Sequence, residues 1–122
     1  MKMKKDDIIK SSSLFEGLSG EEVDTISILI FEKLYGKGEP IFFEGDEADG
    51  FYIVSSGQIK VIKMNPMGKE HILHIFGPGE PVGEVPVFSK QPFPANAEAL
   101  VKSATLFFPR KDFVALIENN PS

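Results

Sequence analysis

The sequence predicts a mainly β fold, an antiparallel barrel or jelly roll with short flanking α-helices. Two observations lead to this class. From Leu34 to Phe108 the chain consists of short runs rich in Ile, Val, Phe and Tyr, separated by Gly, Pro and Asp, which is the pattern of strands and turns. On either side of this stretch, apolar residues recur at helical spacing. The order helix, many short strands, helix is typical of a closed antiparallel architecture.

The first helix is predicted over roughly Ser19 to Lys33. Ser19 and Glu22 stand at the spacing of a capping box, in which the hydroxyl and the carboxylate each accept a hydrogen bond from an unpaired amide of the first turn. Apolar side chains then follow at helical spacing at Val23, Ile26, Leu29 and Ile30. A second helix is predicted from Arg110 to Asn119, before a stop signal at Asn120 and Pro121.

Eight strands are predicted between these helices. Their ranges are Glu32–Tyr35, Pro40–Phe43, Gly50–Ser55, Gln58–Met64, Glu70–Phe76, Pro81–Val82, Ala95–Ala99 and Ala104–Pro109. Ser56 and Gly57 predict a hairpin turn. Residues 65–68 predict a second turn, of a type that the sequence leaves open. The run from Lys69 to Phe76 is apolar on both faces, which is typical of a strand that is buried on both sides or lines a cavity.

Composition bounds the function. The 122 residues suit one domain, and the absence of Cys excludes disulfides, thiolate zinc sites, iron–sulfur clusters and Cys nucleophiles. The net charge of -5 disfavours DNA binding by this segment, because nucleic-acid binders need a basic face. The basic residues at the front are expected to be a solvated cluster within a leader over residues 1–13. They are Lys2, Lys4, Lys5 and Lys10.

Targeting signals are not evident. No apolar run approaches the ~20 residues that cross a bilayer, and the N-terminus lacks the apolar middle of a secretory signal. A cytoplasmic location, without a membrane partner, is therefore expected.

Glycines stand at regular places among the predicted strands. The segments KGEPIFFEGDEADGFYIVSSGQIKVIK and ILHIFGPGEPVGE contain most of them. In these segments the chain resembles the cyclic-nucleotide-binding-domain family, in particular its bacterial Crp/Fnr branch, over residues 14–122. The resemblance implies a double-stranded β-roll that senses an effector and has no catalytic activity. Because a roll reverses direction at each corner, four glycines are expected to shape corners without touching a ligand. They are Gly38, Gly45, Gly57 and Gly79.

A second set of residues corresponds to the family's phosphate-binding cassette. In the family a Gly-Glu pair opens a short helical turn, and an Arg followed by Ser or Thr completes the site. Gly83, Glu84 and Val85 keep the first half, but without gaps Pro94 stands at the Arg position and Ala95 at the hydroxyl position. Proline supplies neither charge nor amide hydrogen, and a buried phosphate without a cation carries a large desolvation cost. Cyclic AMP and cyclic GMP are therefore expected to bind weakly or not at all.

Glu84 has two interpretations. Its carboxylate either accepts a hydrogen bond from a ligand or is satisfied by local amides. The segment from Gln91 to Ala99 resembles the Fnr-like and nitric-oxide-responsive branches, some members of which bind haem in the hollow of the roll. His71 and His74 are the imidazole candidates for such a haem. Their spacing of three on a strand predicts opposite faces, so that both could not bind one iron.

The resemblance also implies partners. They are a small-molecule effector or haem, a second copy through a dimer helix expected after Pro121, and DNA through a further domain that this chain does not contain. Three alternatives stay open, namely a genuine cyclic-nucleotide module, a haem-based sensor of nitric oxide or redox state, and a hollow closed by residues 92–94. A cupin-like enzyme is more remote, because two His without His-x-His spacing do not make a metal site.

Overall fold

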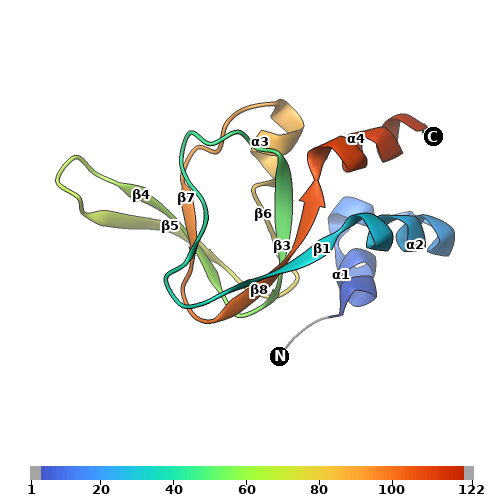
Figure 1. Ribbon diagram of the computed structural model, residues 1–122, viewed down its shortest axis with the longest axis horizontal. Coiled ribbons are helices and arrows are strands. Elements are labelled where there is room, and N and C mark those ends of the chain that lie inside the picture. Colours follow the sequence, from blue (N-terminus) through green and yellow to red (C-terminus); the bar gives the residue numbers. More distant parts are fainter. Residues whose placement is uncertain (1–3, 120–122) are drawn as a thin grey trace.

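The computed structural model describes residues 4–119, which form two facing sheets with helices against one of them (Figure 1). The mainly β class with short flanking helices is confirmed. The elements in chain order are α1 (Lys5–Ser11), the 3-10 turn η1 (Ser13–Phe15), α2 (Gly20–Leu29), β1 (Phe31–Tyr35), β2 (Pro40–Phe42), β3 (Gly50–Ser56), β4 (Ile59–Met64), β5 (Glu70–Phe76), β6 (Pro81–Val82), α3 (Glu84–Ser89), β7 (Asn96–Ala99), β8 (Ser103–Pro109) and α4 (Arg110–Asn119).

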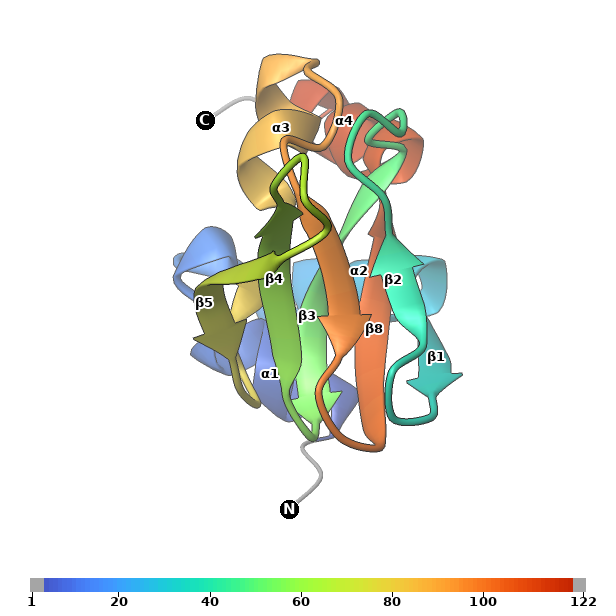
Figure 2. The same cartoon turned by 90° about the vertical axis from the view of Figure 1, so that its left-hand side faces the viewer.

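The two sheets have four strands each and are antiparallel throughout. The first has the order β1-β8-β3-β6 and the second β2-β7-β4-β5. The edge strands β1 and β2 lie on the same side of the roll, whereas α3 and α4 lie together at one end (Figure 2). Because the chain passes between the sheets at most of its turns, the sheets enclose a common interior.

The first sheet has a core on both of its faces. On the helix side, Phe51 and Phe108 stack with ring centroids 4.8 Å apart, and Phe15 and Phe113 pack on them. On the interior side, Tyr52 packs against Phe42 of the second sheet. Each large ring buries on the order of 150–250 Å², so these aromatic side chains supply much of the area that holds helices and sheets together.

The predicted capping box is present. The Glu22 amide donates to Ser19 Oγ at 3.2 Å, and the Ser19 amide donates to Glu22 Oε1 at 3.0 Å. The helix ends at Leu29 rather than near Lys33, because the residues from Phe31 onward pair with β8 as an edge strand. The fixed pairing with β8 overrides the helical continuation that the apolar spacing allowed.

Residues 5–11 are not a solvated leader, so this part of the expected domain boundary is wrong. They form α1, in which Ile8 and Ile9 are fully buried against the rest of the core. Lys5 is also engaged, since its Nζ donates to the carbonyls of Ser27 at 3.3 Å and Ile30 at 3.1 Å. These carbonyls lie at the end of α2, where a cation satisfies unpaired acceptors and the helix dipole. Lys2 lies outside the described residues.

The Ser56–Gly57 turn is not a hairpin. It joins β3 in the first sheet to β4 in the second, and the two strands do not pair with each other. Gly57 has φ +81°, and a Cβ there would lie 2.5 Å from the carbonyl oxygen of Lys102. The turn is therefore a corner between sheets. The turn predicted at residues 65–68 is present and joins the paired strands β4 and β5, and the Gly68 amide donates to the Asn65 carbonyl.

The expectation of a buried β5 is also wrong. The strand is the outer edge of its sheet and only Phe76 is partly buried. Ile72, Leu73 and Ile75 are 49%, 54% and 40% exposed. The β4–β5 hairpin protrudes from the body of the roll (Figure 1). The sequence pattern of two apolar faces was correct, but no other layer of the described chain covers either one.

Candidate functional site

The cassette segment begins at a glycine in the left-handed conformation. Gly83 has φ +80° and caps α3, so the chain turns sharply from β6 into the helix. A Cβ at this position would lie 2.9 Å from Cε1 of Phe93. The structure therefore brings Gly83, at the start of the predicted cassette, against Phe93, which directly precedes Pro94.

Phe93 fills the space where these halves meet. Its ring is buried and stacks on that of Phe42 at a centroid distance of 3.8 Å and an interplanar angle of 7°. Its backbone is fixed on both sides, because its amide donates to the Asp46 carbonyl and its carbonyl accepts from the Gly45 amide. Of residues 92–94, which the sequence offered together as a closure of the hollow, it is the side chain of Phe93 that fills this space.

The remaining cassette residues differ in exposure. Pro94 is exposed and Ala95 is buried, while Val85 is 68% exposed. Glu84 is half-buried, and within residues 4–119 its carboxylate has no hydrogen-bond or ion-pair partner. The interpretation in which local amides satisfy Glu84 therefore has no hydrogen bond to support it. A half-buried carboxylate without a partner can accept a hydrogen bond from an incoming donor.

The four corner glycines all have positive φ, between +81° and +89°. Three of them also tie neighbouring segments together through their amides. Gly38 donates to Ala99 and Gly79 donates to Val54, each at 2.8 Å. Gly45 donates to Phe93 at the same distance. These bonds fix the corners of the roll around the interior.

His71 and His74 share a face, contrary to the prediction from their spacing. The register places His71 opposite Lys63 and His74 opposite Val61, with an irregularity between the two pairs. Val61 and Lys63 are two apart on β4 and point the same way, and directly opposed residues lie on one face. A β-bulge in β5 thus cancels the alternation.

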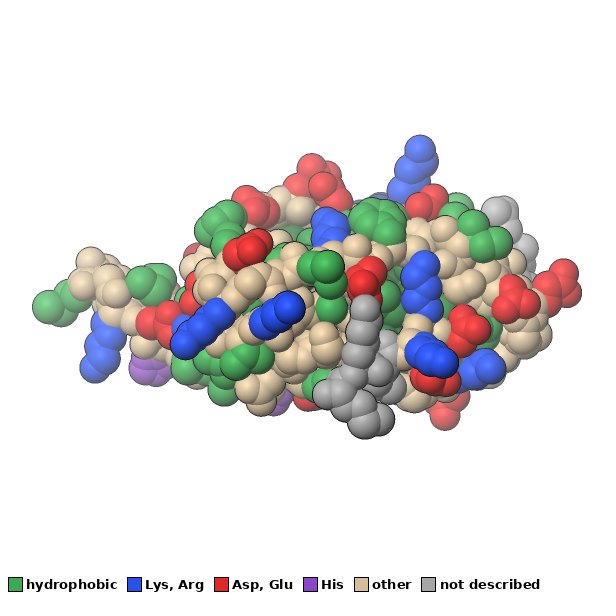
Figure 3. Space-filling view, turned by 60° about the horizontal axis from the view of Figure 1, so that its bottom comes forward, with side chains coloured by type: hydrophobic (Ala, Val, Ile, Leu, Met, Phe, Trp, Pro, Cys, Tyr) green, Lys and Arg blue, Asp and Glu red, His purple; other side chains and the backbone are tan. Residues whose placement is uncertain are grey.

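The two imidazoles lie on the surface. Both residues are exposed, and His74 Nε2 is 3.9 Å from Glu80 Oε2. Histidine side chains are visible at the protruding hairpin (Figure 3). Among residues 4–119, no three His, Asp or Glu side chains are grouped as a metal site requires.

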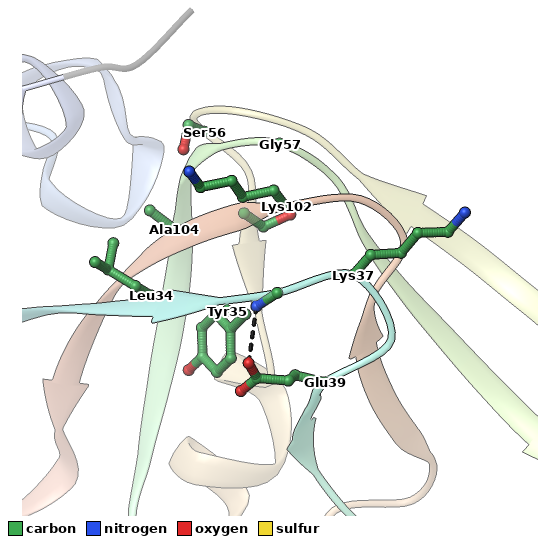
Figure 4. A pocket seen from close by; sticks show the side chains of 10 residues that line it. Leu34, Tyr35, Lys37, Glu39, Ser56, Gly57, Lys102 and Ala104 are labelled. Atoms are coloured by element: carbon green, nitrogen blue, oxygen red, sulfur yellow. Dashed lines mark hydrogen bonds between the residues drawn. The ribbon is translucent and has the colours of Figure 1, made fainter.

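A cavity with a volume of about 880 Å³ lies at the opposite end of the roll from α3. It is formed where three interstrand turns meet, and Lys37, Glu39 and Lys102 line it (Figure 4). Glu39 Oε1 accepts a hydrogen bond from the Gly36 amide, and burial raises the pKa of Tyr35 at its wall. Neither this cavity nor three smaller ones is lined by the cassette residues Gly83, Glu84, Val85, Pro94 and Ala95.

Residues 32–120 match the cyclic nucleotide-binding domain. The chain belongs to this family. The cyclic AMP receptor protein of Thermus thermophilus is 36% identical over 113 residues, covering 93% of this chain and 52% of that protein. The CRP-like cAMP-activated global transcriptional regulator of Mycobacterium tuberculosis is 25% identical over 116 residues, covering 95% and 52%. The sensor domain of the transcriptional regulator DNR from Pseudomonas aeruginosa has a TM-score of 0.86 at 28% identity, covering 94% and 77%.

Family membership confirms the resemblance and the β-roll. The chain spans about half the length of the curated regulators that it matches. The preference for the Fnr-like or nitric-oxide-responsive branch stays a prediction. No helix within residues 4–119 is long and apolar enough to cross a bilayer.

Proposed function

We propose that the chain is the effector-sensing domain of a Crp-like transcription regulator, and that cyclic AMP is not its high-affinity ligand. Family membership and the similarity to Crp-like regulators support the sensing role and the absence of catalysis. In such a regulator, a dimer helix and a DNA-binding domain would act on DNA, while this domain would bias the equilibrium between two states.

The packing of Phe93 carries the argument about the ligand. A cyclic nucleotide needs room beside Gly83 and a cation for its phosphate. The ring of Phe93 fills that room, and Pro94 leaves the expected cationic position uncharged. The residues present therefore do not fit a nucleotide phosphate, whose desolvation would not be compensated.

The contacts between α3 and α4 give a physical route for a signal. Arg110 Nε at the start of α4 donates to the Val87 carbonyl of α3 at 3.0 Å. Phe88 of α3 packs against Phe113 of α4 at 5.4 Å, and both contact Phe51 in the sheet. A ligand that moved α3 would therefore displace α4, the last element described.

The histidines do not support a resident haem. An axial ligand is expected in an enclosed, largely apolar pocket, because burial and the surrounding dielectric set the properties of the iron. His71 and His74 instead lie exposed on the outer edge of the sheet. The effector we propose is a small molecule other than a cyclic nucleotide.

A thermal-shift titration tests the ligand part of this proposal. A ligand at 100 times its Kd stabilises a fold by about 2.7 kcal/mol, a shift of several degrees for a domain of this size. We expect no shift of the wild-type chain with millimolar cyclic AMP. The matching domain of the Thermus thermophilus protein serves as the positive control. A shift of several degrees in the wild type would contradict the proposal.

The lack of response to cyclic AMP can also be measured through DNA binding. In a chimaera, this chain replaces the matching segment of the Thermus thermophilus regulator, and DNA binding is measured with and without cyclic AMP. We expect DNA binding that no longer responds to cyclic AMP. A chimaera that still responds to cyclic AMP would contradict the proposal.

A further inference from the structure

A second cavity opens between the edge strands β1 and β2, with a volume of about 430 Å³. Its walls come from both sheets and from the loop between β2 and β3. The rings that line it are Phe42, Phe43, Tyr52, Phe93 and Phe107. Such rings present negative π-faces, which attract cations.

An ammonium group of the chain already lies on these rings. Lys33 Nζ is 4.3 Å from the ring centroid of Phe107 and 5.7 Å from that of Tyr52. The side chain comes from the edge strand β1 and has no carboxylate partner among the described residues. Lys33 thus places an alkylammonium group on ring faces at the wall of the cavity.

Carboxylates at the same cavity exceed this one cation. Asp46, Glu47 and Asp49 line it, and none of the three forms an ion pair within residues 4–119. Asp46 Oδ2 accepts a hydrogen bond from the Phe43 amide, which holds the Asp46 carboxylate beside the backbone of Phe43. Three carboxylates against one ammonium leave two negative charges uncompensated, which matches the charge of an organic dication.

Two of these carboxylates also act on Tyr52 at the wall of the cavity. Burial is the main cause that raises the pKa of Tyr52 to about 12. The carboxylates of Asp49 and Asp46 add to the rise, and so does Tyr35 once it is itself ionised in alkali. The negative charge that disfavours a tyrosinate at the cavity wall favours a cation there.

From the ring faces, the bound lysine and the carboxylates, we infer that this cavity binds a short aliphatic diamine or polyamine. One ammonium displaces or joins that of Lys33 on the rings, and the other lies among the carboxylates. The apolar chain between them contacts Phe42 and Phe93, the stacked pair that also fills the cassette. The site is independent of the proposed regulatory role, because it rests only on the chemistry of the cavity.

Calorimetric titration with 1,5-diaminopentane tests the site, with amide chemical shifts to locate the binding. We expect saturable binding with shifts at Lys33 and Tyr52, and none with 1,5-pentanediol, which has the same chain without charge. Lys33→Gln removes the competing ammonium and should tighten binding about fivefold. Asp49→Asn should weaken it about fivefold.

Asp24→Asn is the matched control, because Asp24 is an exposed acid on α2 that does not line the cavity. It should leave the Kd unchanged. Equal weakening by Asp24→Asn and Asp49→Asn would overturn the inference, since it would show general attraction to a chain of net charge -5. Absence of binding to both the wild type and Lys33→Gln, each with unchanged Tm, would overturn it too. Neither outcome involves DNA or cyclic AMP.

Discussion

Gly83 and Phe93 show how one residue determines what its neighbour can do. The left-handed glycine leaves a gap that a Cβ would close, and the ring of Phe93 occupies that gap. A residue with a side chain at position 83 would meet both an unfavourable φ and a steric clash. The filled interior of the roll therefore depends on a glycine and an aromatic residue ten positions apart.

Replacement of Gly83 by Ala should destabilise the fold by about 1–3 kcal/mol. Urea unfolding measures the effect. Gly20→Ala is the control, because Gly20 is helical, has no positive φ and has no other atom within 4 Å of its Cβ position. The control should be neutral or slightly stabilising. Equal effects of the two changes would contradict the packing described for Phe93.

The ionisation of Tyr52 predicts a loss of stability in alkali. Its pKa of about 12 in the folded chain exceeds the ordinary value near 10. Above pH ~10 the unfolded chain releases the proton while the folded chain keeps it, so the free energy of unfolding falls as the pH rises toward about 12. Below pH ~10 the stabilisation is fully present.

A spectrophotometric titration of tyrosinate checks this value. The chain has two Tyr residues, so Tyr35→Phe leaves Tyr52 as the sole chromophore of this kind. We expect its absorbance to rise well above pH 10, because burial and the two Asp carboxylates still raise the pKa after the contribution of Tyr35 is removed. A midpoint near 10 would show that Tyr52 is solvated in the folded chain. Tyr52→Phe should reduce the alkaline loss of stability.

At the level of elements, α1 was expected to be solvated but packs on the core, and β5 was expected to be buried but is exposed. The polar composition of residues 1–13 suggested a solvated leader, yet Ile8 and Ile9 anchor α1 in the core. The apolar composition of β5 suggested burial, yet it is an exposed edge strand. Composition reports what a segment could bury, whereas burial depends on which layers lie beside it.

Ile8→Ala should lower the free energy of unfolding by about 2–5 kcal/mol, because it leaves a cavity beneath α1. Ile28→Ala is the control, since Ile28 is 82% exposed and surface changes usually stay within about 0.5 kcal/mol. Thermal and urea unfolding compare the two. An effect of Ile8→Ala as small as that of the control would mean that α1 is not part of the folded domain.

At the scale of the whole molecule, the net negative charge of the chain disfavours direct binding to DNA. The net charge of -5 gives this domain an overall repulsion from phosphate. Charges of both signs are interspersed over the face in Figure 3. Any action on DNA would therefore depend on parts of a longer protein.

The isolated domain should not bind duplex DNA even at low ionic strength. Fluorescence anisotropy of a labelled duplex, titrated with the chain at ~50 mM salt, measures this. Binding whose logarithm falls linearly with the logarithm of salt concentration would contradict the prediction, because that slope counts phosphate contacts.

The sequence by itself determined the fold class, all eight strands and the capping box of α2. Each of these depends on local pattern, such as alternation, turn residues or the Ser19–Glu22 spacing. The resemblance also identified the family, because its glycines stand at corners that require positive φ. The assignment of the cassette to Gly83 and Glu84, with Pro94 at the position of the cation, follows from residue type and order and stays a prediction.

Only the tertiary structure decided which surfaces are covered. It separated β3 from β4, exposed the histidines on one face through a bulge, and stacked Phe93 on Phe42. It also placed Lys33 over the rings of Tyr52 on β3 and Phe107 on β8, which are 19 and 74 residues away in sequence. Such contacts join segments distant in the chain, so they follow from sheet order and register, which local pattern does not encode.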